Sequence, residues 1–251
     1  MAGHSKWKQI KRQKGAADAK RSQVFTKLGR EITVAAKQGG SGDPDANPRL
    51  RLAIEKAREA NMPKDNIDRA IKRGTGEAEG AELEEVVYEG YGPGGTAILV
   101  EALTDNRNRT VSDLRNAFEK AGGNLGEAGS VAWQFESRGL ITLEANGADA
   151  DDLALRAMDT DADDVRVDSG AIEVYTQPSA LEAVRRQLAD SGVAVSAAEV
   201  MMVPKSTVPL DGKLAEQVLR LLDKLDELDD VQRVASNADF PEDVLASYAE
   251  G

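Results

Sequence analysis

The spacing of apolar residues changes once along the chain, at residues 74–85, and this change constrains the fold class. Before it, apolar side chains recur every three or four positions, as on one face of an α-helix. After it come short apolar runs, such as residues 86–90 and 96–104, which glycine and proline separate as they do strands. The segment between them, GTGEAEGAELEE, is acidic and contains glycine, so we expect a linker. A helical module followed by α/β domains is therefore predicted.

Local start and stop signals predict three helices in the first part of the chain. The first should begin near Asp18 and end at Gly39. Asn47, which is followed by proline, should cap the second helix, and Asp65 should cap the third, which Gly74 ends. Six apolar side chains are expected in the core of this module: Phe25, Leu28, Ile32, Ile54, Ile67 and Ile71.

The order of elements in residues 139–203 is strand, helix, strand, strand, helix, strand, which is a split βαβ unit. The segments on either side supply further strands and helices, including a half-buried strand at 131–136 in which Val131, Trp133 and Phe135 face inward. The middle unit is thus expected to be inserted into a second α/β sandwich.

The predicted fold class is therefore α+β, with an N-terminal three-helix module that carries a basic arm. Two ferredoxin-like α/β sandwich domains follow, one inserted in the other. The expected boundaries are 1–80 for the arm and helical domain, 81–137 plus 205–240 for one α/β domain, 138–204 for the inserted domain and 241–251 for a C-terminal tail.

Charge is divided unevenly along the chain. Residues 1–30 contain nine Lys or Arg and a single acid, Asp18. Residues 1–75 carry a net charge of +10 and the remainder carries −22, which gives −12 in total. A cationic arm attracts phosphate, whereas an anionic body repels it. The sequence therefore predicts that nucleic acid binds at the basic N-terminal module. The acidic residues can at the same time serve solubility.

The arm itself, residues 1–17, has too few large apolar side chains to bury a face. We expect it to be mobile and to become ordered on a polyanion. The candidate nucleic-acid-binding residues of the arm and first helix are Lys6, Trp7, Lys8, Lys11, Arg12, Lys14, Lys20 and Arg21.

Trp7 stands among lysines and admits two interpretations. An exposed indole beside phosphate-seeking charges offers a stacking surface for the bases of single strands or RNA. Alternatively, Trp7 anchors the arm on the helical module.

Arg107 and Arg109 are further candidates, because they lie at the predicted start of a helix. Two cations there oppose the helix dipole, and together with bare backbone N–H groups they invite a phosphate. The alternative is that Asp105 or Glu101 pairs with them. A phosphate-ligand enzyme or sensor that uses these two arginines is a third, separate hypothesis for the function.

The residue inventory argues against enzymatic chemistry. The chain has no cysteine, which excludes disulfides, thiolate metal sites and cysteine nucleophiles. Its one histidine, His4, cannot form a metal cluster alone. We expect no catalytic residue, no metal site and no cofactor. No apolar run reaches the ~18 residues of a membrane span, and the start of the chain has no apolar secretory segment. A cytoplasmic location without membrane contact is expected.

Two motif-like segments have simpler explanations. The G-x-G-x-x-G pattern at 90–95 stands between two predicted strands and contains Pro93, so a hairpin loop is expected instead of a dinucleotide site. Residues 159–170 begin like a calcium loop, but Asp164 and Gly170 stand where that loop needs Gly and Glu. A solvated acidic loop is predicted there.

Four segments resemble the YebC/PmpR family, whose members include a mitochondrial translational activator. They are GHSKWKQIKRQKGAADAKRSQVFTKLGREI, NPRLRLAIEKAREANMPKDNIDRAIKRG, YEGYGPGGTAILVEALTDNRNRT and GSVAWQFESRG. The resemblance implies three domains, one inserted in another, and no enzymatic activity. It also implies that Asn106 and Asn108 belong with Arg107 and Arg109 to a second family motif, beside the basic motif of the arm.

Two functions follow from the resemblance and the charge together. One is a DNA-binding regulator of transcription that acts through the basic N-terminal module. The other is a ribosome-associated translation factor that binds ribosomal RNA and relieves stalling, for example at proline runs. The sequence does not set the oligomeric state, the target or the direction of regulation.

Overall fold

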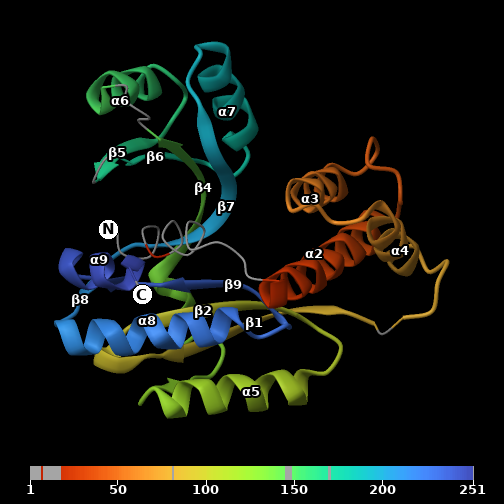
Figure 1. Ribbon diagram of the computed structural model, residues 1–251, viewed down its shortest axis with the longest axis horizontal. Helices are drawn as coiled ribbons and strands as arrows, with labels where there is room; N and C mark the ends of the chain where they lie inside the picture. Colours follow the sequence, from red (N-terminus) through yellow and green to blue (C-terminus); the bar gives the residue numbers. More distant parts are fainter. Residues whose placement is uncertain (1–6, 8–17, 81, 145–148, 169–170, 251) are drawn as a thin grey trace. The chain divides into compact units, whose positions relative to one another are not determined.

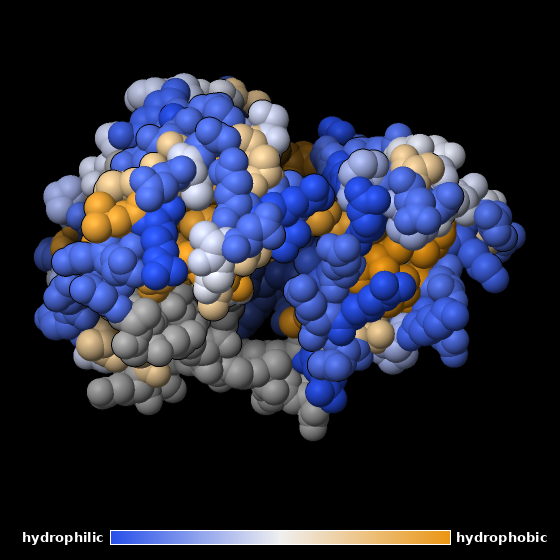
Figure 2. Space-filling model, turned by 90° about the horizontal axis from the view of Figure 1, so that it is seen from above, coloured by the Kyte–Doolittle hydropathy of each residue, from blue (hydrophilic) through white to orange (hydrophobic). Residues whose placement is uncertain are grey.

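The computed structural model of the chain describes residue 7 and residues 18–80, 82–144, 149–168 and 171–250 (Figure 1). These residues divide into two compact units. Residues 133–207 form the inserted unit, and the described residues before and after them form the flanking unit. Hydrophilic residues predominate on the face that Figure 2 shows, in keeping with a chain of which 30% of the residues are charged.

The flanking unit begins with the helical module, which consists of α2 (Asp18–Gly39), α3 (Pro48–Glu59) and α4 (Lys64–Gly74). The predicted start of the second helix is confirmed, since the Leu50 N–H donates to Asn47 Oδ1 at 3.1 Å. The predicted cap of the third is wrong. Because the helical backbone begins directly after Pro63, at Lys64, Pro63 is the N-cap residue of α4 and Asp65 lies inside its first turn.

The core of the helical module matches the expectation. Ile32, Ile54 and Ile67 are buried, and Phe25, Leu28 and Ile71 pack against them partly buried. Helices α2 and α4 approach each other closely at Gly74, where an added Cβ would lie 2.4 Å from the Thr33 carbonyl oxygen. Gly74 therefore does more than end a helix, because a side chain there would force the two helices apart.

The flanking unit continues with a sheet of β1 (Glu84–Tyr91), β2 (Ala97–Thr104), β3 (Asn124–Leu125) and β9 (Val231–Ser236) in the order β3-β1-β2-β9. The predicted hairpin loop is confirmed: β1 and β2 are antiparallel and joined through η1 (Pro93–Gly95). Gly94 and Gly95 have φ of 70° and 75°, a conformation that favours glycine.

Helices α5 (Arg107–Lys120), α8 (Gly212–Asp226) and α9 (Glu242–Glu250) complete the flanking unit, with a short parallel pair of β8 (Val208–Pro209) and β10 (Ala238–Asp239). Side chains of α5 and α8 bury the sheet residues in one core. Residues 241–251 were expected to be a tail, but α9 places Val244 and Leu245 in that core. Apolar residues at helical spacing explain the difference, because they give the segment a face to bury.

The inserted unit runs β4 (Phe135–Glu144), α6 (Ala150–Met158), β5 (Asp164–Asp168), β6 (Ala171–Thr176), α7 (Leu181–Asp190) and β7 (Val195–Pro204). Its antiparallel sheet has the order β5-β6-β4-β7, the ferredoxin-like arrangement that the element order predicts. Side chains of α6 and α7 share one core with β4 and β6, so both helices cover the same face of the sheet.

One predicted strand is wrong. Residues 132–134 form the 3-10 turn η2 (Ala132–Gln134), and β4 begins only at Phe135. The carboxylate of Glu89 accepts the N–H groups of Val131 and Ala132, which a strand would have used in its ladder. Val131 and Phe135 are buried as expected, but Trp133 is 68% exposed.

Candidate nucleic-acid interface

Most of the predicted arm lies outside the described residues: Lys6, Lys8, Lys11, Arg12 and Lys14. Lys20 and Arg21 lie in the first turn of α2, and the side chain of Arg21 is exposed. The exposed position of Arg21 leaves it accessible to a phosphate.

Trp7 is buried, whereas base stacking would require an exposed indole. Its side chain is 1% exposed and belongs to the core of the flanking α/β domain. The indole N–H donates to Asp223 Oδ1 at 3.2 Å, and the Tyr248 hydroxyl donates to Asp223 Oδ2 at 2.5 Å. Burial, and then the Asp223 carboxylate, raise the pKa of Tyr248. The anchor interpretation therefore describes Trp7, but the indole is anchored on α8 in the core of the α/β domain and not on the helical module.

Six exposed cations lie on α3 and α4, and within the described part of the chain no carboxylate pairs with them: Arg51, Arg58, Lys64, Arg69, Lys72 and Arg73. Other cations of the helical module do have partners: Lys27 with Asp226, Lys37 with Glu82, Arg49 with Glu85 and Lys56 with Glu31. The module thus keeps a set of unpaired positive charges on the two helices that follow α2.

Arg107 and Arg109 are both paired. Arg107 Nη2 lies 2.5 Å from Glu84 Oε2. Arg109 Nη2 lies 2.6 Å from Asp105 Oδ1 and 2.9 Å from both carboxylate oxygens of Asp230. The structure therefore shows the two arginines paired with carboxylates, which was the alternative to phosphate binding. Asp105 is a partner as expected, but the other partners are Glu84 and Asp230 instead of Glu101.

The start of α5 offers little to an anion for a second reason. The Arg109 N–H donates to Asn106 Oδ1 at 3.1 Å, so Asn106 caps the helix. A phosphate would have to displace this cap and compete with Glu84 and Asp230 for the two arginines. The two arginines that the hypothesis of a phosphate-ligand enzyme or sensor requires are therefore paired with carboxylates in this structure.

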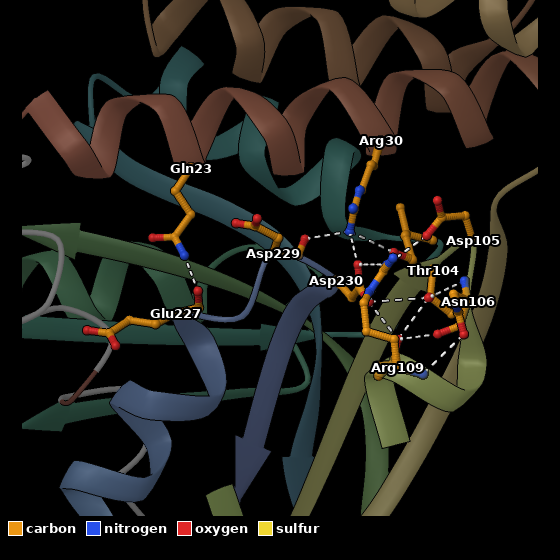
Figure 3. A network of polar contacts seen from close by, with 11 residues as sticks. Gln23, Arg30, Thr104, Asp105, Asn106, Arg109, Glu227, Asp229 and Asp230 are labelled. Atoms are coloured by element: carbon orange, nitrogen blue, oxygen red, sulfur yellow. Dashed lines mark hydrogen bonds and ion pairs between the residues drawn. The ribbon is translucent and has the colours of Figure 1, made fainter. Parts of the chain in front are cut away.

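Asp230 is the residue that sequence reasoning missed. Its side chain is 7% exposed and lies between Arg30 of α2 and Arg109 of α5 (Figure 3). The hydroxyl of Thr110 donates to Asp230 Oδ2 at 2.6 Å, and that of Thr104 does so at 3.3 Å. Burial works to raise the pKa of Asp230, but the hydrogen bonds from Thr110, Arg109 and Arg30 outweigh it and lower the pKa. Asp230 is therefore an ionised carboxylate that links α2 to the α/β domain.

The same face of α2 contacts the acidic turn at 226–230 at two further points. Gln23 Nε2 donates to the Glu227 carbonyl, and Lys27 Nζ donates to the Asp226 carbonyl. Residues 23, 27 and 30 recur at helical spacing, so a single stripe of α2 docks on this turn. That stripe is occupied by protein, so the exposed, unpaired cations of the described helical module are Arg21 and the six on α3 and α4.

No set of three His, Cys, Asp or Glu side chains that could hold a metal ion occurs among the described residues. In the same part of the chain, no helix is both long and apolar enough to cross a membrane.

Comparison with known proteins places these features in a family. Residues 5–77 match the family model described as TACO1/YebC protein N-terminal domain, and residues 83–238 match that of the TACO1/YebC second and third domain. A probable transcriptional regulatory protein of Dehalococcoides mccartyi is 58% identical, covering 99% of this chain and 98% of its own. One from Chloroflexus aurantiacus is 55% identical, with 99% of each chain covered.

A solved structure is similar over most of the chain as well. The crystal structure of a conserved hypothetical protein from Aquifex aeolicus superposes with a TM-score of 0.81 at 47% identity, covering 90% of this chain and 93% of the other.

Proposed function

Because the chain belongs to the TACO1/YebC family, we propose that it is a non-enzymatic regulator of gene expression that binds nucleic acid through its cationic N-terminal module. More specifically, we propose a DNA-binding regulator of transcription. This more specific function is supported by the names of the relatives, which are called probable transcriptional regulatory proteins.

The observation that carries the proposal is the set of unpaired cations on α3 and α4. Their guanidinium and ammonium groups have no carboxylate partner in the described residues, so their charge is available to phosphate. Binding to a polyanion releases condensed counterions, and this gain needs no base-specific contact. The rest of the chain, with its net charge of −22, repels nucleic acid and confines binding to the helical module and arm.

The absence of catalytic chemistry is part of the proposal. It is supported by the lack of cysteine, by the single histidine, and by the pairing of Arg107 and Arg109 with carboxylates. The charges that a small phosphorylated substrate would need in this part of the chain already have partners.

A second candidate, a ribosome-associated translation factor, uses the same surface on RNA. It is favoured by the solvent-facing side of α4, where Asp65 and Asp68 lie among the cations. If α4 entered the major groove of a duplex, it would bring these two carboxylates close to phosphates. Contacts to the backbone of structured RNA do not require one helix to enter a groove.

Binding at several salt concentrations tests the proposal. Fluorescence anisotropy would follow a labelled DNA duplex and a labelled structured RNA with the wild-type chain and with a triple variant, Arg51→Gln, Arg69→Gln and Arg73→Gln. If each arginine contacts one phosphate of duplex DNA, the slope of log affinity against log salt should become shallower by about 2.7.

The matched control neutralises Arg156, Arg185 and Arg220, surface arginines that each pair within their own helix. An unchanged slope in the first variant, or an equal change in the control, would contradict the proposed surface. Tighter binding of RNA than of DNA at the same salt would favour the translation factor.

A further inference from the structure

Leu155 and Met158 are exposed apolar residues of α6, in the inserted unit. Their side chains are 62% and 59% exposed. They are three positions apart, so they lie side by side on one turn of the helix. Among the described residues, no other pair of exposed large apolar side chains shares a helix turn. Single apolar side chains are common on protein surfaces, but adjacent ones indicate a surface that another molecule covers.

The core of the inserted unit does not use this pair. Helix α6 lies over β5 and β6 (Figure 1) and buries Leu153, Ala154 and Ala157 against the sheet. With 3.6 residues per turn, Leu155 falls on the side of the helix that faces away from these three residues. The helix therefore has one apolar face that the fold buries and a second apolar site that it leaves exposed.

The strand beside α6 carries a further exposed apolar residue. Strand β5 is an edge strand of the sheet, and its Val167 is 46% exposed. Val167 lies opposite Ile172 of β6, so the two side chains share a face of the sheet. Ile172 belongs to the core that α6 covers. Exposed apolar side chains thus occur on α6 and on the same side of the adjacent edge strand.

Two carboxylates flank Leu155 along the helix. Asp151 lies four positions before it and Asp159, the C-cap residue, lies four positions after it, so the three side chains form one stripe. Both aspartates are exposed, and no cation of the described chain pairs with them. Their negative charge is therefore available to a partner.

The surrounding segment is also acidic. Residues 149–168, which include α6 and β5, contain eight Asp and two Arg. Both arginines are already paired, Arg156 with Asp152 and Arg166 with Asp164. The exposed apolar side chains consequently lie in a field of surplus negative charge.

This charge decides which class of molecule fits the surface. Nucleic acids and anionic lipids present phosphates, which the carboxylates repel. A second copy of the chain, related by a two-fold axis, would bring the same acidic surface against itself. A protein segment that combines Lys or Arg with apolar side chains complements both the charge and the apolar residues.

We propose that Leu155, Met158, Asp151 and Asp159 form a docking surface for a basic amphipathic segment of a partner protein. Apolar side chains of the segment cover Leu155 and Met158, and its cations pair with the two aspartates. The helical rise places Asp151 and Asp159 about 12 Å apart, the spacing of cations about eight residues apart on a helix. The inference goes beyond the proposed function, because the surface lies outside the cationic helical module.

A model peptide tests the apolar part of the surface. Anisotropy would follow the binding of the full chain to a labelled peptide of four Lys-Leu-Ala-Lys repeats, and to a second peptide with Ser in place of each Leu. Leu155→Gln should weaken binding of the first peptide by about 5- to 30-fold, the loss typical of an energetically important interface residue. Leu52→Gln, which changes an exposed leucine of α3, is the matched control and should stay within about twofold of wild type.

The charged part of the surface has its own control. Replacing Asp151 and Asp159 by Asn should weaken binding of the first peptide and make its salt dependence shallower. Asp113→Asn with Glu119→Gln removes two exposed acids of α5 and changes the net charge equally. Equal losses in the two double variants would overturn the inference, because the peptide would then respond to net charge alone. Equal affinity of the two peptides for the wild-type chain would do the same.

A crosslink in growing cells tests the partner class. With a photo-crosslinking amino acid in place of Leu155, the full-length protein should crosslink to Lys- and Arg-rich segments of another protein. The crosslinks should disappear when Asp151 and Asp159 are replaced by Asn. Crosslinks to a second copy of the chain, crosslinks to nucleic acid, or none above background would overturn the inference.

The two proposals fail separately. Leu155→Gln should bind a DNA duplex within about twofold of wild type, because residue 155 lies outside the helical module. Loss of peptide binding by neutralising Arg51, Arg69 and Arg73 would contradict the docking surface, whereas loss of duplex binding by the same change supports the proposed function.

Discussion

Arg30 and Asp230 are 200 positions apart in the chain, yet Arg30 Nη1 contacts Asp230 Oδ1 and joins the first described helix to the α/β domain. The same guanidinium nitrogen also donates to the Asp229 carbonyl at 2.8 Å and to the Leu103 carbonyl at 3.2 Å. Since Arg109 occupies the other side of the Asp230 carboxylate, two cations share one buried acid.

Asp230→Asn should destabilise the fold by about 1.5–3 kcal/mol, the range for hydrogen bonds to charged groups. The variant keeps the shape of the side chain but leaves Arg30 and Arg109 without their shared counter-charge. Urea unfolding measures the loss. Asp226→Asn is the control, because the side chain of Asp226 is 28% exposed, against 7% for Asp230, and its ion pair with Lys27 is long, at 3.5 Å. Its loss of stability should stay below about 1 kcal/mol, and equal losses for both variants would contradict the linking role of Asp230.

Acid should remove the contribution of Asp230. Its pKa is lower in the folded than in the unfolded chain, so its stabilisation is present above the unfolded pKa of about 4 and is lost as pH falls through the folded pKa. The free energy of unfolding, measured from pH 7 down to pH 3, should therefore fall less steeply at the acid end for Asp230→Asn than for wild type. Parallel curves would show that Asp230 does not titrate in this range.

Acid should also remove a stabilising contribution of Glu89. Burial works to raise its pKa, but the N–H groups of Gly129, Val131 and Ala132 outweigh this and lower the pKa. Glu89→Gln should therefore also flatten the acid limb of the stability curve, and it should loosen the loop that precedes Trp133. Hydrogen exchange at Val131 and Ala132 measures the loosening. Exchange at the wild-type rate would contradict the role assigned to the carboxylate.

Trp7→Ala should cost about 3–5 kcal/mol of stability, because it empties a buried site in the flanking core. Thermal unfolding measures this loss. Trp7→Phe should cost less, since it keeps most of the apolar volume. A variant as stable as the wild type would show that the indole is not part of the core.

The arm makes a separate prediction about salt. If arm and helical module together neutralise about six phosphates of duplex DNA, log affinity should fall with log salt with a slope near −5. Replacing Lys8, Lys11 and Lys14 by Gln should make the slope shallower, and anisotropy at several salt concentrations measures it. An unchanged slope would remove the arm from the contact.

Local signals allowed most of the fold to be predicted. Asn47 followed by proline gave the start of α3, and the glycines of residues 90–95 gave the hairpin, because a cap or a turn depends on a few neighbouring residues. The element order of the inserted unit similarly gave its ferredoxin-like sheet. Each of these features is encoded within a short stretch of chain.

Long-range contacts explain what could not be predicted. The strand expected at 131–136 fails because Glu89, some 40 residues earlier, accepts the N–H groups of Val131 and Ala132. Trp7 is buried by a partner 216 residues away, whereas alternation alone suggested that Trp133 would be the buried tryptophan. Arg109 likewise pairs with Asp230, 121 residues away. No local pattern identifies such partners.

Binding of nucleic acid by the N-terminal module is tested most directly by crosslinking the full-length protein to nucleic acid in growing cells and identifying the crosslinked peptides and sequences. The prediction is that peptides from residues 5–77 dominate, with the attached sequences showing whether the target is DNA or ribosomal RNA. Crosslinks absent from residues 5–77 and found only in the α/β domains, or no crosslinks above background, would contradict it.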